Sequence, residues 1–261
     1  KESIFFSKKF FFHKFDSITY RILKYSYCLN MEIVLIRHGQ PKWVDGDQYD
    51  LNPGLTELGK IQADKSASIF SENSFDELWV SPLKRAQETM YPFKEKGVAQ
   101  ILKTFDWLEE ALDDEEKELF GKSGGDIEKF FEQRNAMSFE QWYESVHGEY
   151  MKGFSSNIFN NLDKNLNSIG ITKVKNDFDS LFNLSESKIE KLLIISHAGT
   201  MSALLSYFLD LDLFPWTWRK YLPRHAGHTT LKSSQISSGH FFRLKEFNNV
   251  TFLNSEEEKT Y

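Results

Sequence analysis

The sequence predicts an α/β fold, a three-layer sandwich in which a mainly parallel central sheet is flanked by helices. Three short apolar runs, at residues 32–36, 77–80 and 192–195, each lead into a turn and then into a helical pattern. Strands that alternate with helices are typical of a parallel sheet covered on both faces. A further strand is expected at residues 98–104, after Gly97.

The ends of the predicted helices carry recognisable capping residues. Thr56 is expected to cap a helix that begins at residue 57, because its hydroxyl can accept a hydrogen bond from a free backbone N–H. Ser81 is expected to cap the next helix, with Pro82 as its first residue. The later segments are assigned by pattern, as one or two helices at 156–187 and an antiparallel hairpin at 229–253.

Two segments differ from this alternating pattern. Residues 104–155 are acidic, then glycine-rich, then aromatic, which predicts an insertion over one edge of the sheet. Residues 1–30 are rich in Phe and in Lys or Arg and contain no Gly, Pro or Ala. We interpret them as a leader or N-terminal extension, with a targeting or membrane-surface segment as the alternative. One domain, residues 31–261, is therefore expected to carry the function.

Composition excludes several classes of protein. The net charge is -6 and no basic stripe is present, which argues against nucleic acid as a partner. A single cysteine, Cys28, excludes an intrachain disulfide and a multi-cysteine zinc site, and it favours a cytoplasmic location. The chain contains no apolar run of about 18 residues, so no transmembrane segment is expected.

The ends of the three predicted strands carry similar chemistry. Arg37 and His38 follow the first strand, Arg85 lies early in the helix after the second, and His197 follows the third. Ligands of such sheets bind at the carboxyl ends of the strands. Two guanidinium groups and nearby helix N-termini are suited to a tetrahedral oxyanion. The pattern predicts a phosphate pocket that needs no metal and no cofactor.

Four motifs in order resemble the signatures of the histidine phosphatase superfamily, the phosphoglycerate mutase-like family. They are "LIRHGQP", "LTELGKIQA", "SPLKRAQET" and "ISHAGT". The resemblance implies a histidine phosphatase-like catalytic domain over residues 31–261, of the phosphatase branch. It also implies that His38 is the nucleophile and becomes phosphohistidine. Such an attack requires a neutral imidazole whose other ring nitrogen donates to a backbone carbonyl or a similar acceptor.

The same resemblance assigns roles around the nucleophile. Arg37, Arg85 and His197 would hold the equatorial phosphoryl oxygens, and His197 would take part in catalysis. Gly39 would let the backbone pass close to the phosphate. Gln40, the next residue of the motif, is counted with the substrate-binding group.

A proton donor for the leaving group is expected in "DWLEEALDD". The resemblance places a glutamate in a Leu-x-Glu context there, and Glu110 fits it after Leu108. Glu109, Asp113 and Asp114 remain alternatives, since a shift of the loop would exchange them.

Two other groups of residues are candidates for lesser roles. His225 and His228 are three residues apart, close enough for one metal, but a structural or substrate-rim role is favoured. Trp107, Trp142 and Tyr143 of the insertion could form an apolar wall over the substrate.

The function predicted is that of a metal-independent phosphomonoesterase of the histidine acid phosphatase type, acting through phosphorylated His38. Its substrate would be a small-molecule phosphomonoester or a phosphoprotein. A phosphoglycerate mutase-type phosphotransferase and a non-catalytic protein that binds phospho-ligands are the alternatives. "RHGQPKWVDG" and "LEEALDD" depart from the mutase pattern, and the presence of every pocket residue argues against a non-catalytic protein.

Overall fold

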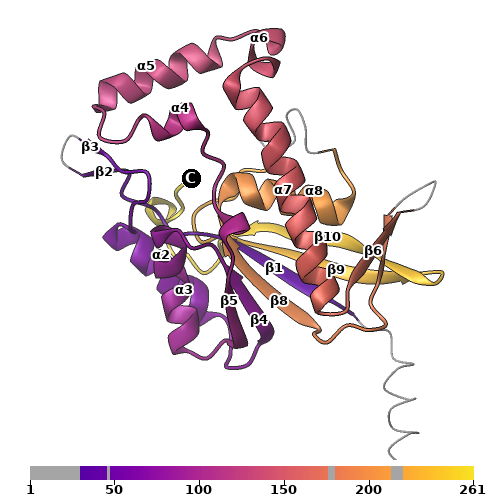
Figure 1. Ribbon diagram of the computed structural model, residues 1–261. Coiled ribbons are helices and arrows are strands. Elements are labelled where there is room, and N and C mark those ends of the chain that lie inside the picture. Colours follow the sequence, from indigo (N-terminus) through magenta and orange to yellow (C-terminus); the bar gives the residue numbers. More distant parts are fainter. Residues whose placement is uncertain (1–29, 46–47, 176–179, 213–219) are drawn as a thin grey trace, which may run out of the picture.

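The computed structural model describes residues 30–45, 48–175, 180–212 and 220–261. Its centre is an eight-stranded sheet with the strand order β5-β4-β8-β1-β9-β10-β7-β6 (Figure 1). One half consists of parallel strands, and their bounds are Ala99–Thr104 (β5), Phe75–Val80 (β4), Lys191–Ser196 (β8) and Glu32–Arg37 (β1). The other half is antiparallel, with His228–Ile236 (β9), Gly239–Asn249 (β10), Ser180–Asn183 (β7) and Thr172–Lys175 (β6).

The sheet is mixed rather than mainly parallel, which corrects the expectation from sequence. Three strand pairings are parallel, and the pairings β1–β9, β9–β10, β10–β7 and β7–β6 are antiparallel. The hairpin at the C-terminal end is confirmed, and it extends the sheet next to β1. Thr172–Lys175 and Ser180–Asn183 also form strands where helix was expected, because the helix before them ends at Ser168.

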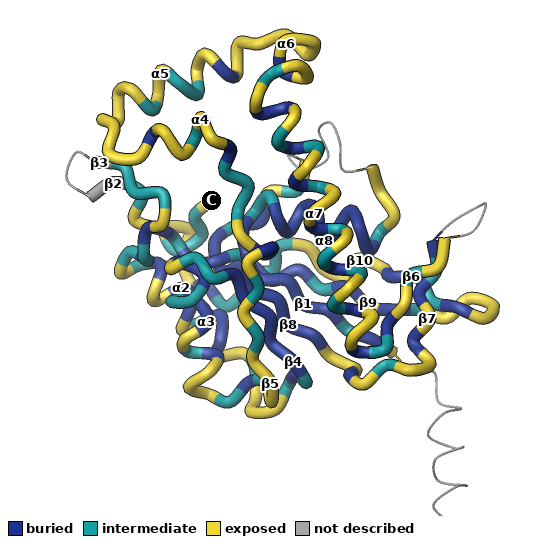
Figure 2. Tube along the Cα trace, viewed as in Figure 1, coloured by how far each residue is buried: buried dark blue, intermediate teal, exposed yellow. Residues whose placement is uncertain are grey.

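Helices cover both faces of the sheet, as a sandwich requires. Ile33 and Leu35 of β1 belong to a core cluster with α7 (Val146–Ser168) and α8 (Ala198–Leu209). The alternate residues Val34 and Ile36 pack with α2 (Glu57–Ser68) and α3 (Lys84–Glu95) on the other face. This alternation is the period-two pattern of a strand buried on both sides. Figure 2 shows these central strands as the most buried part of the molecule.

One of the two predicted helix caps is confirmed. The Thr56 hydroxyl accepts a hydrogen bond from Gly59 N at 2.9 Å, at the start of α2. Helix α3 begins at Lys84 rather than at Pro82, and Leu83 occupies the cap position. Ser81 is therefore free to bond elsewhere, and its hydroxyl lies 2.8 Å from His197 Nε2.

The predicted insertion is a set of short helices above the sheet edge (Figure 1). It contains the 3-10 helix Asp106–Leu108 and the α-helices Asp114–Lys117 (α4), Gly124–Asn135 (α5) and Phe139–Tyr143 (α6). We call the helices α4, α5 and α6 the lid. Trp107 and Trp142 are buried in the core instead of forming a wall over the substrate, because Trp107 packs edge-on against Trp79. Tyr143 is exposed.

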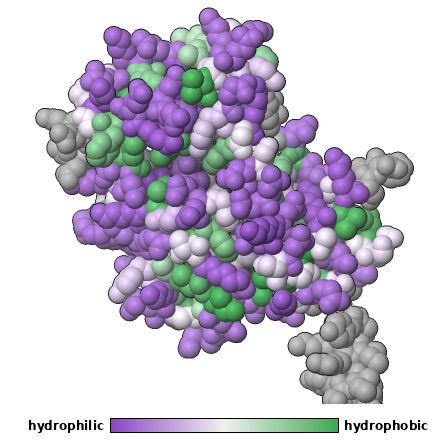
Figure 3. Space-filling model, in the orientation of Figure 1, coloured by the Kyte–Doolittle hydropathy of each residue, from purple (hydrophilic) through white to green (hydrophobic). Residues whose placement is uncertain are grey.

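Small elements complete the described chain: Val44–Asp45 (β2), Gln48–Tyr49 (β3) and the 3-10 helix Glu256–Glu258 (η2). The predicted leader, residues 1–30, lies outside the described residues except for its last position. Among the described helices, none has the length and apolar character needed to span a membrane. The face drawn in Figure 3 is mostly hydrophilic, with apolar residues scattered over it.

Candidate active site

Strand register brings the predicted site residues to one edge of the sheet. Arg37 is paired with Ser196, and Val80 is paired with Ile195. The residues that follow these pairs, His38, His197 and Ser81, therefore leave neighbouring strands at the same level. The rings of His38 and His197 lie 5.0 Å apart, measured between centroids.

His38 is almost fully buried, and its tautomer is set by the main chain. Its Nδ1 lies 2.7 Å from the carbonyl oxygen of Gly39, which can only accept, so the proton is on Nδ1 and Nε2 carries a lone pair. This confirms the expected carbonyl acceptor. Burial, with His197, Arg85, Arg37 and His225 nearby, holds the pKa of His38 well below its usual value. The ring is therefore neutral.

Two guanidinium groups lie near this ring, and that of Arg85 reaches its lone pair. Arg85 is fully buried and its Nε donates to His38 Nε2 at 3.3 Å, while its guanidinium carbon stacks 4.8 Å from the Trp43 ring centroid. Arg37 is held by its NH1 donating to Pro223 O at 2.7 Å. Arg37 Nε and Arg85 NH2 are buried and have no hydrogen-bond partner within the described part of the chain. Burial lowers the pKa of Arg37 to about 10, which leaves it charged at neutral pH.

His197 and a second histidine, His225, lie beside the ring of His38 and each has a buried nitrogen without a partner among the described residues. The Ser81 hydroxyl accepts from Leu83 N at 3.2 Å, so it can donate its own proton to His197 Nε2. His197 Nδ1 then carries a proton and faces the site, where no described residue pairs with it. Burial and the two arginines lower the pKa of His197, so this imidazole is also neutral.

His225 is oriented by a hydroxyl in the same way as His197. The sequence analysis favoured only a structural or substrate-rim role for it. The Thr260 hydroxyl accepts from Gln62 Nε2 at 2.9 Å and lies 2.9 Å from His225 Nδ1, to which it can donate. This leaves His225 Nε2 as a donor without a partner among the described residues. Its ring lies 5.6 Å from that of His38, and burial lowers its pKa to about 2. His228, by contrast, is structural, because it bonds Ser66 and stacks on Phe70.

Antiparallel pairing explains why His225 was missed. Ile36 is paired with His228, so the turn before β9 runs beside the end of β1. Ala226 N donates to both Arg37 O and His38 O in this turn. The histidines of "RHAGH" were visible in the sequence, but only the placement of β9 next to β1 separates their roles.

In the structure, Gly39 and Gln40 contact α2 and the loop that precedes it. A Cβ at Gly39 would lie 2.4 Å from Gly59 O, so the glycine permits close contact with α2, and its role beside a phosphate stays a prediction. Gln40 N donates to Gln62 Oε1, and Gln40 Oε1 accepts from Thr56 Oγ1 at 2.8 Å. Both residues therefore fix the loop after β1 against α2, and a direct substrate contact by Gln40 stays a prediction.

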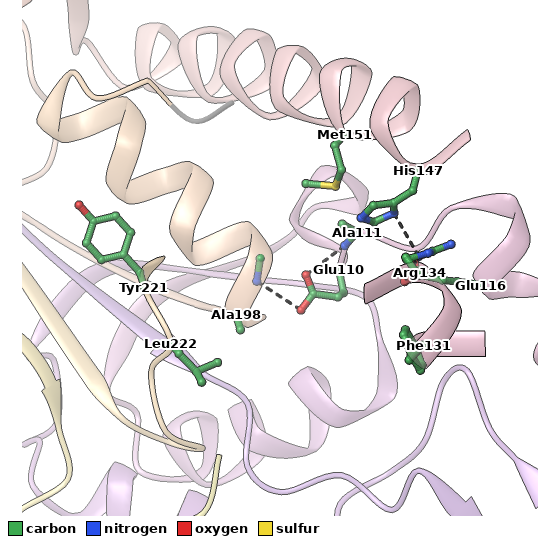
Figure 4. A pocket seen from close by; sticks show the side chains of 11 residues that line it. Glu110, Ala111, Glu116, Phe131, Arg134, His147, Met151, Ala198, Tyr221 and Leu222 are labelled. Carbon is green, nitrogen blue, oxygen red and sulfur yellow. Dashed lines mark hydrogen bonds and ion pairs between the residues drawn. The ribbon is translucent and has the colours of Figure 1, made fainter. Parts of the chain in front are cut away.

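Among the acidic candidates, Glu110 is the one that faces the site. Its Oε2 accepts from Gly199 N at 3.4 Å, at the start of α8, and a Cβ at Gly199 would lie 2.5 Å from its Oε1 (Figure 4). Its charge raises the pKa values of Arg37 and Arg85 against the effect of burial. Glu109 and Asp114 are exposed, and Asp113 is buried within the lid.

A cavity of about 430 Å³ opens beside Glu110, between the lid and the start of α8 (Figure 4). Arg134, Glu116 and His147 form its charged far wall, and Tyr221 and Leu222 lie on the opposite side of Glu110 (Figure 4). The lining residues are Glu110, Ala111, Glu116, Phe131, Arg134, His147, Met151, Ala198, Gly199, Tyr221 and Leu222.

The far wall of this cavity is a buried ionic cluster. Arg134 of α5 lies 2.8 Å from a Glu116 oxygen and 3.0 Å from one of Asp113, both near the start of α4. His147 of α7 lies 2.7 Å from the same Asp113 oxygen. The ligand-type atoms of Asp113, Glu116 and His147 lie within 4.8 Å of one another, but the Arg134 guanidinium already supplies positive charge there.

Three known proteins that are similar to this chain are all named as phosphatases. Phosphoserine phosphatase 1 of Hydrogenobacter thermophilus is 24% identical over 187 residues, which cover 70% of this chain and 78% of the relative. The alpha-ribazole phosphatase of Shigella flexneri superposes with a TM-score of 0.58 at 18% identity, covering 84% of this chain and 96% of that one. A phosphoserine phosphatase of Entamoeba histolytica, solved with 3-phosphoglyceric acid, gives a TM-score of 0.55 at 18% identity, covering 86% and 100%.

A match to a family model shows to which family the chain belongs. The model described as the histidine phosphatase superfamily (branch 1) matches residues 33–167, slightly more than half of the chain. The match contains the loop after β1, the start of α3 and Glu110, and the structure adds His197 and His225 at the same sheet edge. The chain therefore belongs to the histidine phosphatase superfamily.

Proposed function

We propose that this protein hydrolyses phosphomonoesters through a phosphohistidine formed on His38. Its neutral Nε2 attacks phosphorus, so that a P–N bond forms while the P–O bond to the leaving group breaks. Glu110 gives a proton to the leaving oxygen. Water then attacks the phosphohistidine and loses a proton to the Glu110 carboxylate, which releases inorganic phosphate and restores both side chains.

The donors around His38 support this assignment. Arg37 Nε, Arg85 NH2, His197 Nδ1 and His225 Nε2 are buried and lack partners among the described residues. Buried donors without partners are costly, and an oxyanion with three terminal oxygens would satisfy them. Because the donors are already in place, they would stabilise the charge that develops on those oxygens in the transition state. This set of unpartnered donors facing a neutral imidazole is the observation that carries the proposal.

The relatives favour hydrolysis of a phosphomonoester, but they do not indicate which alcohol is released. Proteins named as phosphoserine and alpha-ribazole phosphatases share a phosphomonoester and differ in the alcohol that it releases. We therefore propose hydrolysis of a small phosphomonoester as the common activity, with a phosphoprotein as the broader expectation. The histidine acid phosphatase type, independence of metals and a cytoplasmic location remain parts of this proposal.

The test is turnover and labelling with the purified chain. Wild type should hydrolyse 4-nitrophenyl phosphate in the presence of EDTA, and His38→Ala should not. Acid-quench of the wild type with a phosphorylated substrate should give an acid-labile phosphoenzyme. Undiminished activity of His38→Ala, or an acid-stable label, would overturn the mechanism. A mutase would instead transfer the phosphoryl group between hydroxyls and release little inorganic phosphate.

A further inference from the structure

The cavity beside Glu110 has two ends of opposite charge. At one end Glu110 adjoins the cationic groups Arg37 and Arg85, whose pKa values respond to its charge. At the other end, Arg134 and Glu116 line the wall. A phosphoryl group held near His38 would therefore project its leaving group past Glu110 and toward the lid.

The far end carries more negative than positive charge. Besides Asp113 and Glu116, Arg134 contacts Glu115 at 3.0 Å, so three carboxylates share one guanidinium. Even a protonated His147 would leave one negative charge in excess. Arg134 is only 6% exposed, and its two terminal nitrogens are both occupied by these contacts. It is therefore not available to bind an anion from the substrate.

Glu116 is the carboxylate of this wall that also lines the cavity. Its side chain is 12% exposed, and burial together with the charge of Asp113 raises its pKa to about 7. A carboxylate that is already costly to ionise would oppose a second negative charge placed beside it. It can, however, accept hydrogen bonds from hydroxyl or ammonium groups.

Apolar side chains complete the lining on both sides of Glu110 (Figure 4). Phe131, Met151 and Leu222 line the cavity together with the small residues Ala111 and Ala198. They offer carbon surface to a substrate skeleton and no positive charge. Among the described residues that line the cavity, none is a cation free to pair with a carboxylate.

We propose that this cavity selects phosphomonoesters whose leaving group carries hydrogen-bond donors, either hydroxyl or ammonium, and no carboxylate. The inference rests on the proposed function, because it assigns the leaving-group side of the same site. Glu116 is the specificity-determining residue, since its carboxylate accepts from donors and repels acids.

Matched pairs of substrates test this directly. O-phosphoserine is phosphoethanolamine with an added carboxylate. 3-Phosphoglycerate has a carboxylate where glycerol 3-phosphate has a hydroxymethyl group. We expect kcat/KM of wild type to be at least about tenfold higher for the non-acidic member of each pair, a difference of about 1.4 kcal/mol. Both members of the first pair keep an ammonium donor and both members of the second keep a hydroxyl donor, so each ratio reports on the carboxylate. Equal rates, or a preference for the acids, would overturn the inference.

A variant locates the effect. Glu116→Gln should reduce the ratio within each pair at least about threefold, because it removes one charge and keeps a group that can accept a hydrogen bond. Glu118→Gln makes the same change at an exposed position nearby and should leave the ratio as in wild type. An unchanged ratio in folded Glu116→Gln would overturn the role of Glu116. Should that variant not fold, the wild-type ratios still decide the inference.

The proposed function fails in a different way from this inference. If wild type does not hydrolyse 4-nitrophenyl phosphate, or does so without His38, the phosphatase assignment is wrong. If it does, and the acidic member of each pair is preferred, only the selection by the far wall is wrong.

Discussion

The sheet edge and the lid bury titratable groups of opposite kinds. The sheet edge holds histidines whose pKa values are lowered by burial, among them His38, His197 and His225. The lid holds Glu116, whose pKa is raised by burial and by Asp113. Burial disfavours the charged form in both regions, so it keeps the histidines of the sheet edge neutral and opposes the ionisation of Glu116 in the lid. The two regions should therefore respond to pH in opposite directions.

They also differ in how they are held together. Strand pairing and backbone hydrogen bonds position the sheet edge, as shown by His38 N donating to Ser196 O at 2.9 Å. The lid is joined through the side chains around Arg134, which connect α4, α5 and α7. Backbone pairing along a sheet fixes positions closely, whereas a side-chain cluster depends on each charge being matched. Substitutions that break one region should leave the other intact.

The largest effect is expected at Glu110, where the two regions meet. Glu110→Gln should slow hydrolysis of alkyl phosphates by roughly 10²- to 10⁴-fold, because the leaving alkoxide needs a proton. A nitrophenyl phosphate, whose leaving group departs as a stable anion, should be slowed far less. Rates for both substrates, measured on the variant and wild type, check this. Glu109→Gln is the control, since that side chain is exposed and should show no dependence on the leaving group.

Acid should destabilise the sheet edge. The folded pKa values of His38, His197, His225 and His228 lie below 6.5, so the unfolded chain binds more protons below that pH. Their contribution is complete above about pH 6.5 and is lost as the pH falls. We expect about 4 kcal/mol less stability at pH 5.5 than at 6.5 from the four together. Urea unfolding at the two pH values measures it, and constant stability across this range would contradict it.

Removal of Arg134 should break the lid. Arg134→Met leaves the carboxylates of Asp113 and Glu116 without their guanidinium partner, which should destabilise the lid by about 3 kcal/mol. Hydrogen exchange of α5 amides should accelerate, while the amides of β1 and β8 should change little. Arg243→Met is the control, because Arg243 is exposed and its loss should change stability by no more than about 0.5 kcal/mol. Equal acceleration in α5 and β1 would show that the lid and sheet unfold as one unit.

The two regions were not equally predictable from sequence. Arg37, His38, Arg85 and His197 all lie next to a strand end or helix start, so local pattern and strand order together place them at one edge. His225 depends on the antiparallel pairing of β9 with β1, which no local pattern specifies. For the same reason, a mainly parallel sheet was expected, although half of the sheet is antiparallel.

In the lid, local pattern was informative about helices but not about contacts. Its acidic residues looked alike in sequence, and only tertiary packing makes Glu110 face the cavity and Glu109 face solvent. The three tryptophan and tyrosine residues proposed as a wall were assigned by composition alone, and burial of Trp107 and Trp142 shows that they serve the core. Charge matching around Arg134 joins residues far apart in the chain, so it could not be predicted from spacing.

The smallest effect tests the opposite pH response of the lid. The folded pKa of Glu116, about 7, lies above its ordinary value of 4.5, so the folded protein binds this proton more tightly than the unfolded chain does. The resulting stability is present below about pH 4.5 and is lost as the pH rises through about 7. Glu116→Gln removes this titration, so its stability relative to wild type should improve by about 2.5 kcal/mol between pH 5 and pH 8. Because both proteins contain the same histidines, the difference between them cancels the response of the sheet edge. Urea unfolding of wild type, Glu116→Gln and the exposed control Glu118→Gln at both pH values measures it. A relative stability of Glu116→Gln that falls from pH 5 to pH 8 would mean that Arg134 outweighs burial and keeps Glu116 ionised.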